Sequence, residues 1–192
     1  MRNPLPRFFT QWRRLSWSQA ARMALLTLFL PLLLPAQTDP LLVNRVKAGF
    51  LFNFARFTEW PDTALRTGAP LRIGVLGKPE VIAVVRTALS GKSVASHPVE
   101  VIDPVVDANW EGLHILYVTS SSSLDEEELA TRLRTPGLLT IGDAPDFASN
   151  GGIIAFFERD GKLRFRINPA TAKNAGLQVS GQLASLAEVI RK

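Results

Sequence analysis

The sequence contains no cysteine, one tyrosine and only two histidines. Without cysteine, the chain cannot form a disulfide scaffold, a thiolate zinc site, an iron–sulfur cluster or a cysteine nucleophile. It also lacks the glycine-rich motifs that hold nucleotide phosphates and the GxSxG motif of serine hydrolases. Neither histidine, His97 or His114, has a carboxylate at ligand spacing. We therefore expect no cofactor, no metal site and no catalytic residue, and keep a hydrolase built on one of these histidines as a third hypothesis.

Acidic residues are absent from the first 36 positions, although the whole chain carries a formal charge of +5. Five of the 22 basic residues lie in that segment: Arg2, Arg7, Arg13, Arg14 and Arg22. The remaining chain has 17 basic and 17 acidic residues and is neutral. A nucleic-acid-binding domain needs its positive charge on the folded part, so we expect no nucleic-acid partner.

The same segment has the pattern of an export signal. Its arginine-rich region is followed by an apolar run at 23–34 and by Leu34-Pro35-Ala36, which offers a cleavage site. The apolar run is shorter than the roughly 20 residues that span a bilayer. We expect residues 1–36 to be a cleaved signal peptide, residues 37–192 to form a single secreted domain, and no membrane span to remain after cleavage.

Strand and helix patterns alternate along that domain. Buried β-rich runs at 71–76, 98–102, 114–118 and 138–141 alternate with helical patterns at 40–60, 79–89 and, after a capping box of Ser123 and Glu126, up to 135. Two alternating runs flank Asp160-Gly161, which is typical of a hairpin, and helices are expected at 169–176 and through Leu183, Leu186, Ala187 and Ile190. The order predicts an α/β three-layer sandwich: a mostly parallel central sheet with helices on both faces and a C-terminal antiparallel hairpin.

The first helix contains an aromatic residue out of place. Its apolar stripe is expected to comprise Val43, Val46, Phe50, Phe54 and Phe57. Phe52 falls instead on the polar face with Arg56, and Trp60 follows the helix. Because aromatic residues and arginine are enriched at interface hot spots, Phe52, Arg56 and Trp60 are the candidate partner-binding residues. Packing of Phe52 under a neighbouring loop is the alternative.

A second candidate site lies on the hairpin. Pairing across Asp160-Gly161 places Phe156 opposite Phe165 on the core face, and leaves Phe157, Arg164 and Arg166 on the other. This combination suits an anionic or aromatic ligand, although a solvated sheet face would look the same. The strand ends at Gly77, Ser120–Ser123 and Asp143 offer a further anion-binding hypothesis.

The stretch Val46–Pro61, VKAGFLFNFARFTEWP, resembles the opening helix of the YfiR-like family of bacterial periplasmic regulators. The likeness continues through residues 139–143, Phe147, 151–153, Phe156, 164–165, 167–168, Ala172, 176–177 and Ser180, so it covers about residues 42–190. The resemblance implies a non-enzymatic α/β domain in the periplasm. The best-understood members look like repressors of a membrane-bound diguanylate cyclase: they contact its periplasmic domain and so limit cyclic di-GMP and biofilm formation.

This sequence departs from the family at one point. Gly112-Leu113 stands where many members have cysteine, so the disulfide switch of such members is not expected here. The resemblance implies that the partner is the periplasmic domain of an inner-membrane signalling protein. A periplasmic sensor or carrier of a small anionic or aromatic molecule is the alternative function, and homodimer formation stays open.

Overall fold

The computed structural model describes residues 39–105, 110–122 and 124–190. The first helix, α2 (Pro40–Arg56), begins where Asp39 caps it, because the Asp39 carboxylate accepts a 2.9 Å hydrogen bond from the main-chain N–H of Leu41. Pro40 occupies the first helical turn, where its missing N–H leaves no hydrogen bond unmade. The predicted start of this helix is confirmed.

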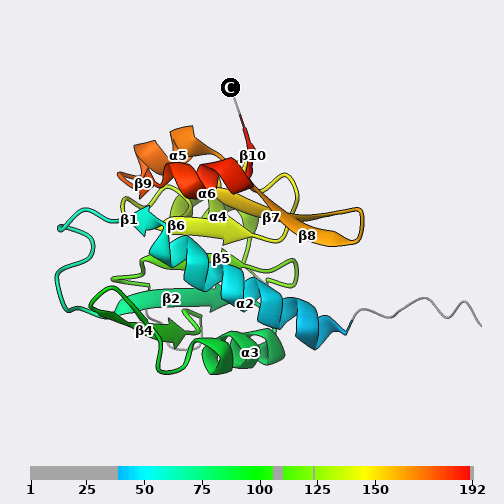
Figure 1. Cartoon of the computed structure of the whole chain (residues 1–192), viewed down its shortest axis with the longest axis horizontal. Coiled ribbons are helices and arrows are strands. Elements are labelled where there is room, and N and C mark those ends of the chain that lie inside the picture. The colour runs from blue at the N-terminus through cyan, green and yellow to red at the C-terminus, as the bar shows by residue number, and fades with distance from the viewer. Residues whose placement is uncertain (1–38, 106–109, 123, 191–192) are drawn as a thin grey trace, which may run out of the picture. The chain divides into compact units, whose positions relative to one another are not determined.

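An eight-stranded sheet forms the centre of the described domain (Figure 1). Its spatial order is β10 (Glu188–Val189), β8 (Lys162–Ile167), β7 (Ile154–Arg159), β6 (Leu139–Gly142), β5 (Ile115–Val118), β2 (Leu71–Leu76), β4 (His97–Ile102) and β3 (Ser93–Val94). Five of its seven pairings are parallel, and the exceptions are β7 with β8 and β3 with β4. The predicted mostly parallel sheet is confirmed.

Helices cover both faces of this sheet. The remaining helices are α3 (Pro79–Leu89), α4 (Glu126–Arg132), α5 (Pro169–Asn174) and α6 (Gly181–Leu186). Alternate side chains of each strand enter opposite hydrophobic clusters: Ile115 and Tyr117 of β5 pack with α2 and α3, whereas Leu116 and Val118 pack with Leu133 beside α4. Figure 1 shows α2 crossing the sheet on one face, with α3 beside it. The three-layer sandwich is thus confirmed.

The hairpin has the predicted register. Phe156 pairs with Phe165 and Ile154 with Ile167, and the turn residue Asp160 adopts a left-handed φ of 54°. Such a φ is common at Asp and Gly in two-residue hairpin turns. The α5 helix also lies where the pattern predicts it.

Three element predictions differ from the structure. The α2 helix ends at Arg56, and Thr58–Glu59 form β1, which pairs antiparallel with β9 (Gln178–Val179). The last helical pattern stops at Leu186, and the chain then extends into β10, leaving Leu186 70% exposed. The α4 cap is Asp125, whose side chain accepts from the main chain of Glu128; the predicted cap, Ser123, lies outside the described residues. Two-residue strands depend on a distant partner, so local periodicity does not reveal them.

The buried arc of α2 is rotated from the predicted stripe. The buried residues are Ala48, Leu51, Phe54 and Ala55, while Val46 is 45% exposed. Of the predicted stripe, Phe54 is fully buried and Phe50 and Phe57 pack against the core at its edge, whereas Val46 is left exposed. Among the described residues, no helix is both long and apolar enough to cross a bilayer.

Candidate functional site

The predicted partner-binding residues lie around the C-terminal end of α2. Phe52 is half-buried at the helix edge, and the Lys92 ammonium lies 5.2 Å from its ring centroid. Arg56 is exposed, with its guanidinium carbon 5.9 Å from the ring of Phe57. Phe52 therefore both packs against the core and presents an edge with a cation beside it. The packing of Phe52 is thus observed, while its role in binding a partner stays a prediction.

Trp60 has a structural bond. Its indole N–H donates a 2.9 Å hydrogen bond to the carbonyl oxygen of Gly137, 77 positions later in the chain. Its ring meets His114 edge to face at 6.5 Å. Trp60 is only partly buried, so part of the ring stays open to a partner. A large change at Trp60 would therefore disturb the fold as well as any contact there.

The hairpin site brings together two of its three predicted residues. The guanidinium carbon of Arg166 lies 4.3 Å from the ring centroid of Phe157, and that ring is largely buried. Arg164 is exposed and lies directly opposite Phe157 in the register of β7 and β8. Stacking of a guanidinium on an aromatic face is a favourable cation–π arrangement.

Sequence reasoning missed Glu188 and Arg159 at this site. Glu188 of β10 forms ion pairs with Arg166, at 3.2 Å, and with Arg159, whose guanidinium also lies 5.2 Å from the Phe157 ring. Arg166 donates in addition to the carbonyl oxygen of Pro145 at 3.0 Å. The only available signal was the apolar pattern of the C-terminus, which favoured a helix and so placed Glu188 elsewhere. Glu188 neutralises part of the positive charge that the sequence assigned to this face.

The carboxyl edge of the sheet carries a nearly buried polar cluster. The Lys47 ammonium of α2 pairs with the Asp143 carboxylate at 2.8 Å, and the two side chains are 14% and 11% exposed. The Tyr117 hydroxyl donates to the same carboxylate at 2.9 Å. Burial, followed by the charge and hydrogen bond of Asp143, raises the pKa of Tyr117 far above its usual value, so the phenol stays protonated. Asp143 is thus used to fasten α2 to the ends of β5 and β6.

Gly77 is needed at the same edge for close packing. A Cβ on Gly77 would lie within van der Waals overlap of the Thr119 side chain, 2.4 Å from its hydroxyl oxygen. Lys78 precedes α3 without a side-chain cap bond. These contacts show that Gly77 packs tightly against the end of β5, while the anion-binding hypothesis for the strand ends stays a prediction.

Both histidines hold the loop between β1 and β2. The Nε2–H of His114 donates to the carbonyl oxygen of Ala64 at 3.1 Å, and its Nδ1 accepts from the main-chain N–H of Arg72 at 3.0 Å. His97 donates through Nδ1 to the carbonyl oxygen of Ala69 at 2.8 Å. Burial lowers the pKa of His114, outweighing the hydrogen bond to Ala64, and the charges of His97 and Arg72 lower it further. Each ring is accounted for as a structural clamp.

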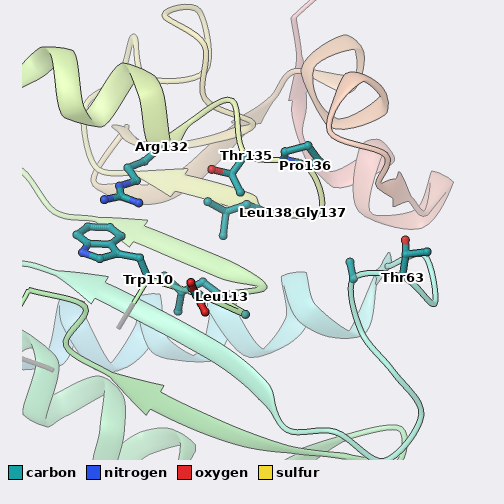
Figure 2. Close-up of a pocket in the computed structure, with 11 residues that line it drawn as sticks. Thr63, Trp110, Leu113, Arg132, Thr135, Pro136, Gly137 and Leu138 are labelled. Atoms are coloured by element: carbon teal, nitrogen blue, oxygen red, sulfur yellow. The ribbon is translucent and has the colours of Figure 1, made fainter. Parts of the chain in front are cut away.

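A hollow of about 430 Å³ lies at the opposite, amino edge of β5 and β6. Figure 2 shows Arg132 and Trp110 facing each other at one side of it, with Thr63 at the other. The Arg132 guanidinium carbon is 4.3 Å from the Trp110 ring centroid, and its Nη2 donates to Glu128 at 3.2 Å. Arg132 and Glu111 are the charged residues of the lining and offset each other. The hollow therefore has no net charge with which to select an anion.

Within the described part of the chain, no three histidine, aspartate or glutamate side chains are grouped so that they could hold a metal ion. The fold and these contacts define the class of protein: an α/β three-layer domain whose charged clusters mostly fasten one element to another. A model of the YfiR/HmsC-like family matches residues 44–188. The chain belongs to that family, whose members are periplasmic and regulatory rather than catalytic.

Other comparisons add little. No curated protein matches the sequence. Among solved structures, a conserved domain protein from Vibrio cholerae O1 biovar eltor is similar, with 11% sequence identity and a TM-score of 0.46. The match covers 77% of this chain and 60% of the Vibrio chain, so this chain spans under two thirds of that protein.

Proposed function

We propose that this protein is a periplasmic regulator that represses a membrane-bound signalling protein, a diguanylate cyclase above all, by binding its periplasmic domain. The observation that carries the proposal is the family match over residues 44–188, which spans almost the whole described domain. Residues 1–36 serve as the cleaved export signal in this proposal, and residues 37–192 are the working domain.

The proposed mechanism is differential binding. The domain binds the partner's inactive state more tightly than its active state, and a signal that weakens this preference releases the partner. A preference of about 2.7 kcal/mol shifts the equilibrium about a hundredfold, which is sufficient for a switch. The absence of cysteine means that the signal acts without a disulfide in this chain.

The proposed contact surface is formed by Phe52, Arg56 and Trp60. Phe52 is half-buried and therefore held in place, while the exposed Arg56 can form hydrogen bonds across an interface. A preorganised aromatic residue next to an arginine binds with little loss of side-chain entropy. This placement is supported by the exposure of Arg56, by the partial exposure of Phe52 and Trp60, and by the enrichment of such residues at interfaces.

Deletion of the gene tests the function. We expect cyclic di-GMP to rise in the deletion strain and to return to its original level when the wild-type gene is restored. The Phe52→Ala and Arg56→Ala variants should restore repression poorly, whereas Lys162→Ala, an exposed cation on the distant hairpin, should restore it fully. For Trp60 the test variant is Trp60→Phe, which keeps an aromatic ring but is smaller and loses the hydrogen bond to Gly137, and it is read only if its melting temperature stays near that of the wild type. An unchanged cyclic di-GMP level after deletion would exclude the cyclase as the target.

A second candidate function is a small-molecule sensor or carrier that uses Phe157, Arg164 and Arg166. The favouring observation is the guanidinium of Arg166 stacked at 4.3 Å on Phe157, with the exposed Arg164 opposite. Benzoate, which combines a ring with a carboxylate, is a suitable probe in a thermal-shift experiment. Binding at 100 times the dissociation constant stabilises by about 2.7 kcal/mol, so a flat melting temperature at millimolar benzoate would count against this function.

A further inference from the structure

A shallow groove runs between α2 and α3, which lie side by side (Figure 1). Its volume is about 370 Å³, and its lining consists of Arg45 from α2 and four small or medium side chains from α3: Ala83, Val84, Thr87 and Ala88. A floor of small aliphatic side chains can accept a bulky apolar residue from another molecule. Phe52 follows Arg45 by seven positions, about two turns along the same face of α2, and the Lys92 ammonium lies 5.2 Å from its ring.

Three large aliphatic residues of α2 lie exposed within six positions of each other. Leu41 is 47% exposed, Leu42 is 55% exposed and Val46 is 45% exposed. Single exposed aliphatic residues are ordinary, whereas a cluster of them on one helix is typical of a binding surface. Leu42 and Val46 are four residues apart and so extend from the same face of the helix.

The charge that α2 contributes to this surface has one sign, whereas α3 contributes the exposed Glu80 one turn before Ala83 and Val84. The α2 helix contains Arg45, Lys47 and Arg56 and no acidic residue. Lys47 is used internally by Asp143. Within residues 39–105, 110–122 and 124–190, the ion pairs involve cations other than Arg45, Arg56 and Lys92. A neutral domain thus displays a local stripe of positive charge along an apolar groove.

We propose that the groove between α2 and α3 binds an acidic amphipathic segment of a partner protein. The segment places an aliphatic side chain on the floor formed by Ala83, Val84 and Ala88, and its carboxylates pair with Arg45 and Lys92. Helix-in-groove binding of this kind uses apolar residues three and four positions apart. The inference rests on the proposed regulatory function for the partner's location, and it adds the chemistry of the segment that is bound.

The concave shape favours a protein segment over a membrane surface. A helix that lies on a bilayer presents a convex apolar face, often with aromatic residues at the headgroup level. Here the apolar floor is recessed between two helices and carries no aromatic side chain. A lipid surface is therefore treated as an outcome that would contradict the proposal.

Photo-crosslinking in the native cells tests this binding. The full-length gene is expressed with p-benzoylphenylalanine in place of Ala83, which is exposed in the groove, and in a control strain in place of Ser185, which is exposed in α6. After irradiation, the cross-linked segment is mapped by mass spectrometry. We expect Ala83, and not Ser185, to link to a protein segment with net negative charge and aliphatic residues three or four positions apart.

Charge reversal provides the matched control. Arg45→Glu should lower the cross-link yield from position 83 at least tenfold, whereas Arg134→Glu, an exposed arginine beyond α4, should leave it unchanged. Both variants must keep the wild-type melting temperature. A cross-link to lipid, to a second copy of this chain or to a segment without acidic residues would contradict the proposal, as would no cross-link at position 83.

The outcome also separates this inference from the proposed function. An acidic segment that belongs to a protein other than a membrane signalling protein would support the groove and contradict the regulatory role. A rise in cyclic di-GMP after gene deletion, together with no cross-link from position 83, would support the role and contradict the groove.

Discussion

The loop between β1 and β2 depends on both histidines of the chain, which bind its carbonyl oxygens at Ala64 and Ala69. His114 can act in this way only while neutral, because its Nδ1 accepts a hydrogen from the main chain of Arg72. Protonation would place a hydrogen on each side of that contact. Burial, the main cause of the lowered pKa of His114, thus favours the neutral ring that this clamp requires.

This arrangement predicts that stability falls in mild acid. The folded-state pKa of His114 lies below the value of about 6.5 in the unfolded chain, so the unfolded state takes up the proton first as pH falls. The contribution of His114 is complete above pH 6.5 and is lost below it, by at most about 1.4 kcal/mol per pH unit. Urea unfolding at several pH values should show this slope in wild type and in the control His97→Gln. The slope should shrink in His114→Gln, and an equal slope in all three proteins would contradict the prediction.

Glycine positions offer a second test at the same scale. A Cβ on Gly142 would lie 2.3 Å from the ring of Phe147, which is buried, whereas a Cβ on Gly49 in α2 meets nothing within 4 Å. We expect Gly142→Ala to destabilise by about 1–3 kcal/mol through overpacking. Gly49→Ala should stabilise by about 1 kcal/mol through helix propensity. Thermal unfolding measures both, and similar effects of the two alanines would show that the ring of Phe147 moves aside.

Among the elements, α2 carries residues of both proposed protein-binding surfaces. One side packs on the sheet through Leu51 and Phe54, one edge lies against α3, and the outward face carries Arg45, Val46 and Arg56. Lys47 fastens the helix to Asp143 at the carboxyl end of β6. The helix is therefore held on one side by the sheet and by Asp143, and its outward side carries the surface that we propose for binding.

The bond between Lys47 and Asp143 predicts a coupled pair of substitutions. Removal of one partner leaves the other charge nearly buried, so Lys47→Ala and Asp143→Ala should each destabilise by about 3 kcal/mol. The double variant should lose less stability than the sum of the two single losses, because no unpaired charge remains. A double-mutant cycle from urea denaturation measures this coupling. Additive losses would show that the two side chains do not stabilise each other.

At the scale of the whole molecule, the excess positive charge lies in the proposed export signal and not in the proposed working domain. Residues 1–36 carry the entire excess of +5, and the rest of the chain is neutral. If residues 1–36 are cleaved as proposed, long-range electrostatic steering of a partner by the remaining neutral chain is weak. Recognition then depends on local surfaces, such as the cationic stripe of α2 or the arginines of the hairpin.

Cleavage itself is directly testable. The protein isolated from the periplasm should have a mass that corresponds to a chain starting near residue 37, and intact-mass spectrometry reports this. A control with Leu26→Arg, which breaks the apolar run, should leave the full-length chain inside the cell. Recovery of periplasmic protein with its first 36 residues intact would contradict the proposed cleavage.

The sequence alone determined the class of fold, the start of α2, the hairpin register and the family. These features follow from local rules: a cap and a proline start a helix, an Asp-Gly pair turns a hairpin, and alternation assigns each strand residue to one face. The family followed from the motif at residues 46–61, which is local as well.

Only the tertiary structure decided which side chains meet. The pairing of β1 with β9, the turn of the C-terminus into β10 and the ion pairs of Glu188 join residues that are far apart in the chain. The groove between α2 and α3 likewise depends on how two helices pack, and the rotation of the buried arc of α2 leaves Val46 exposed. Periodicity specifies that a helix has an apolar side, but the shape of the surface it packs against selects the arc that is buried.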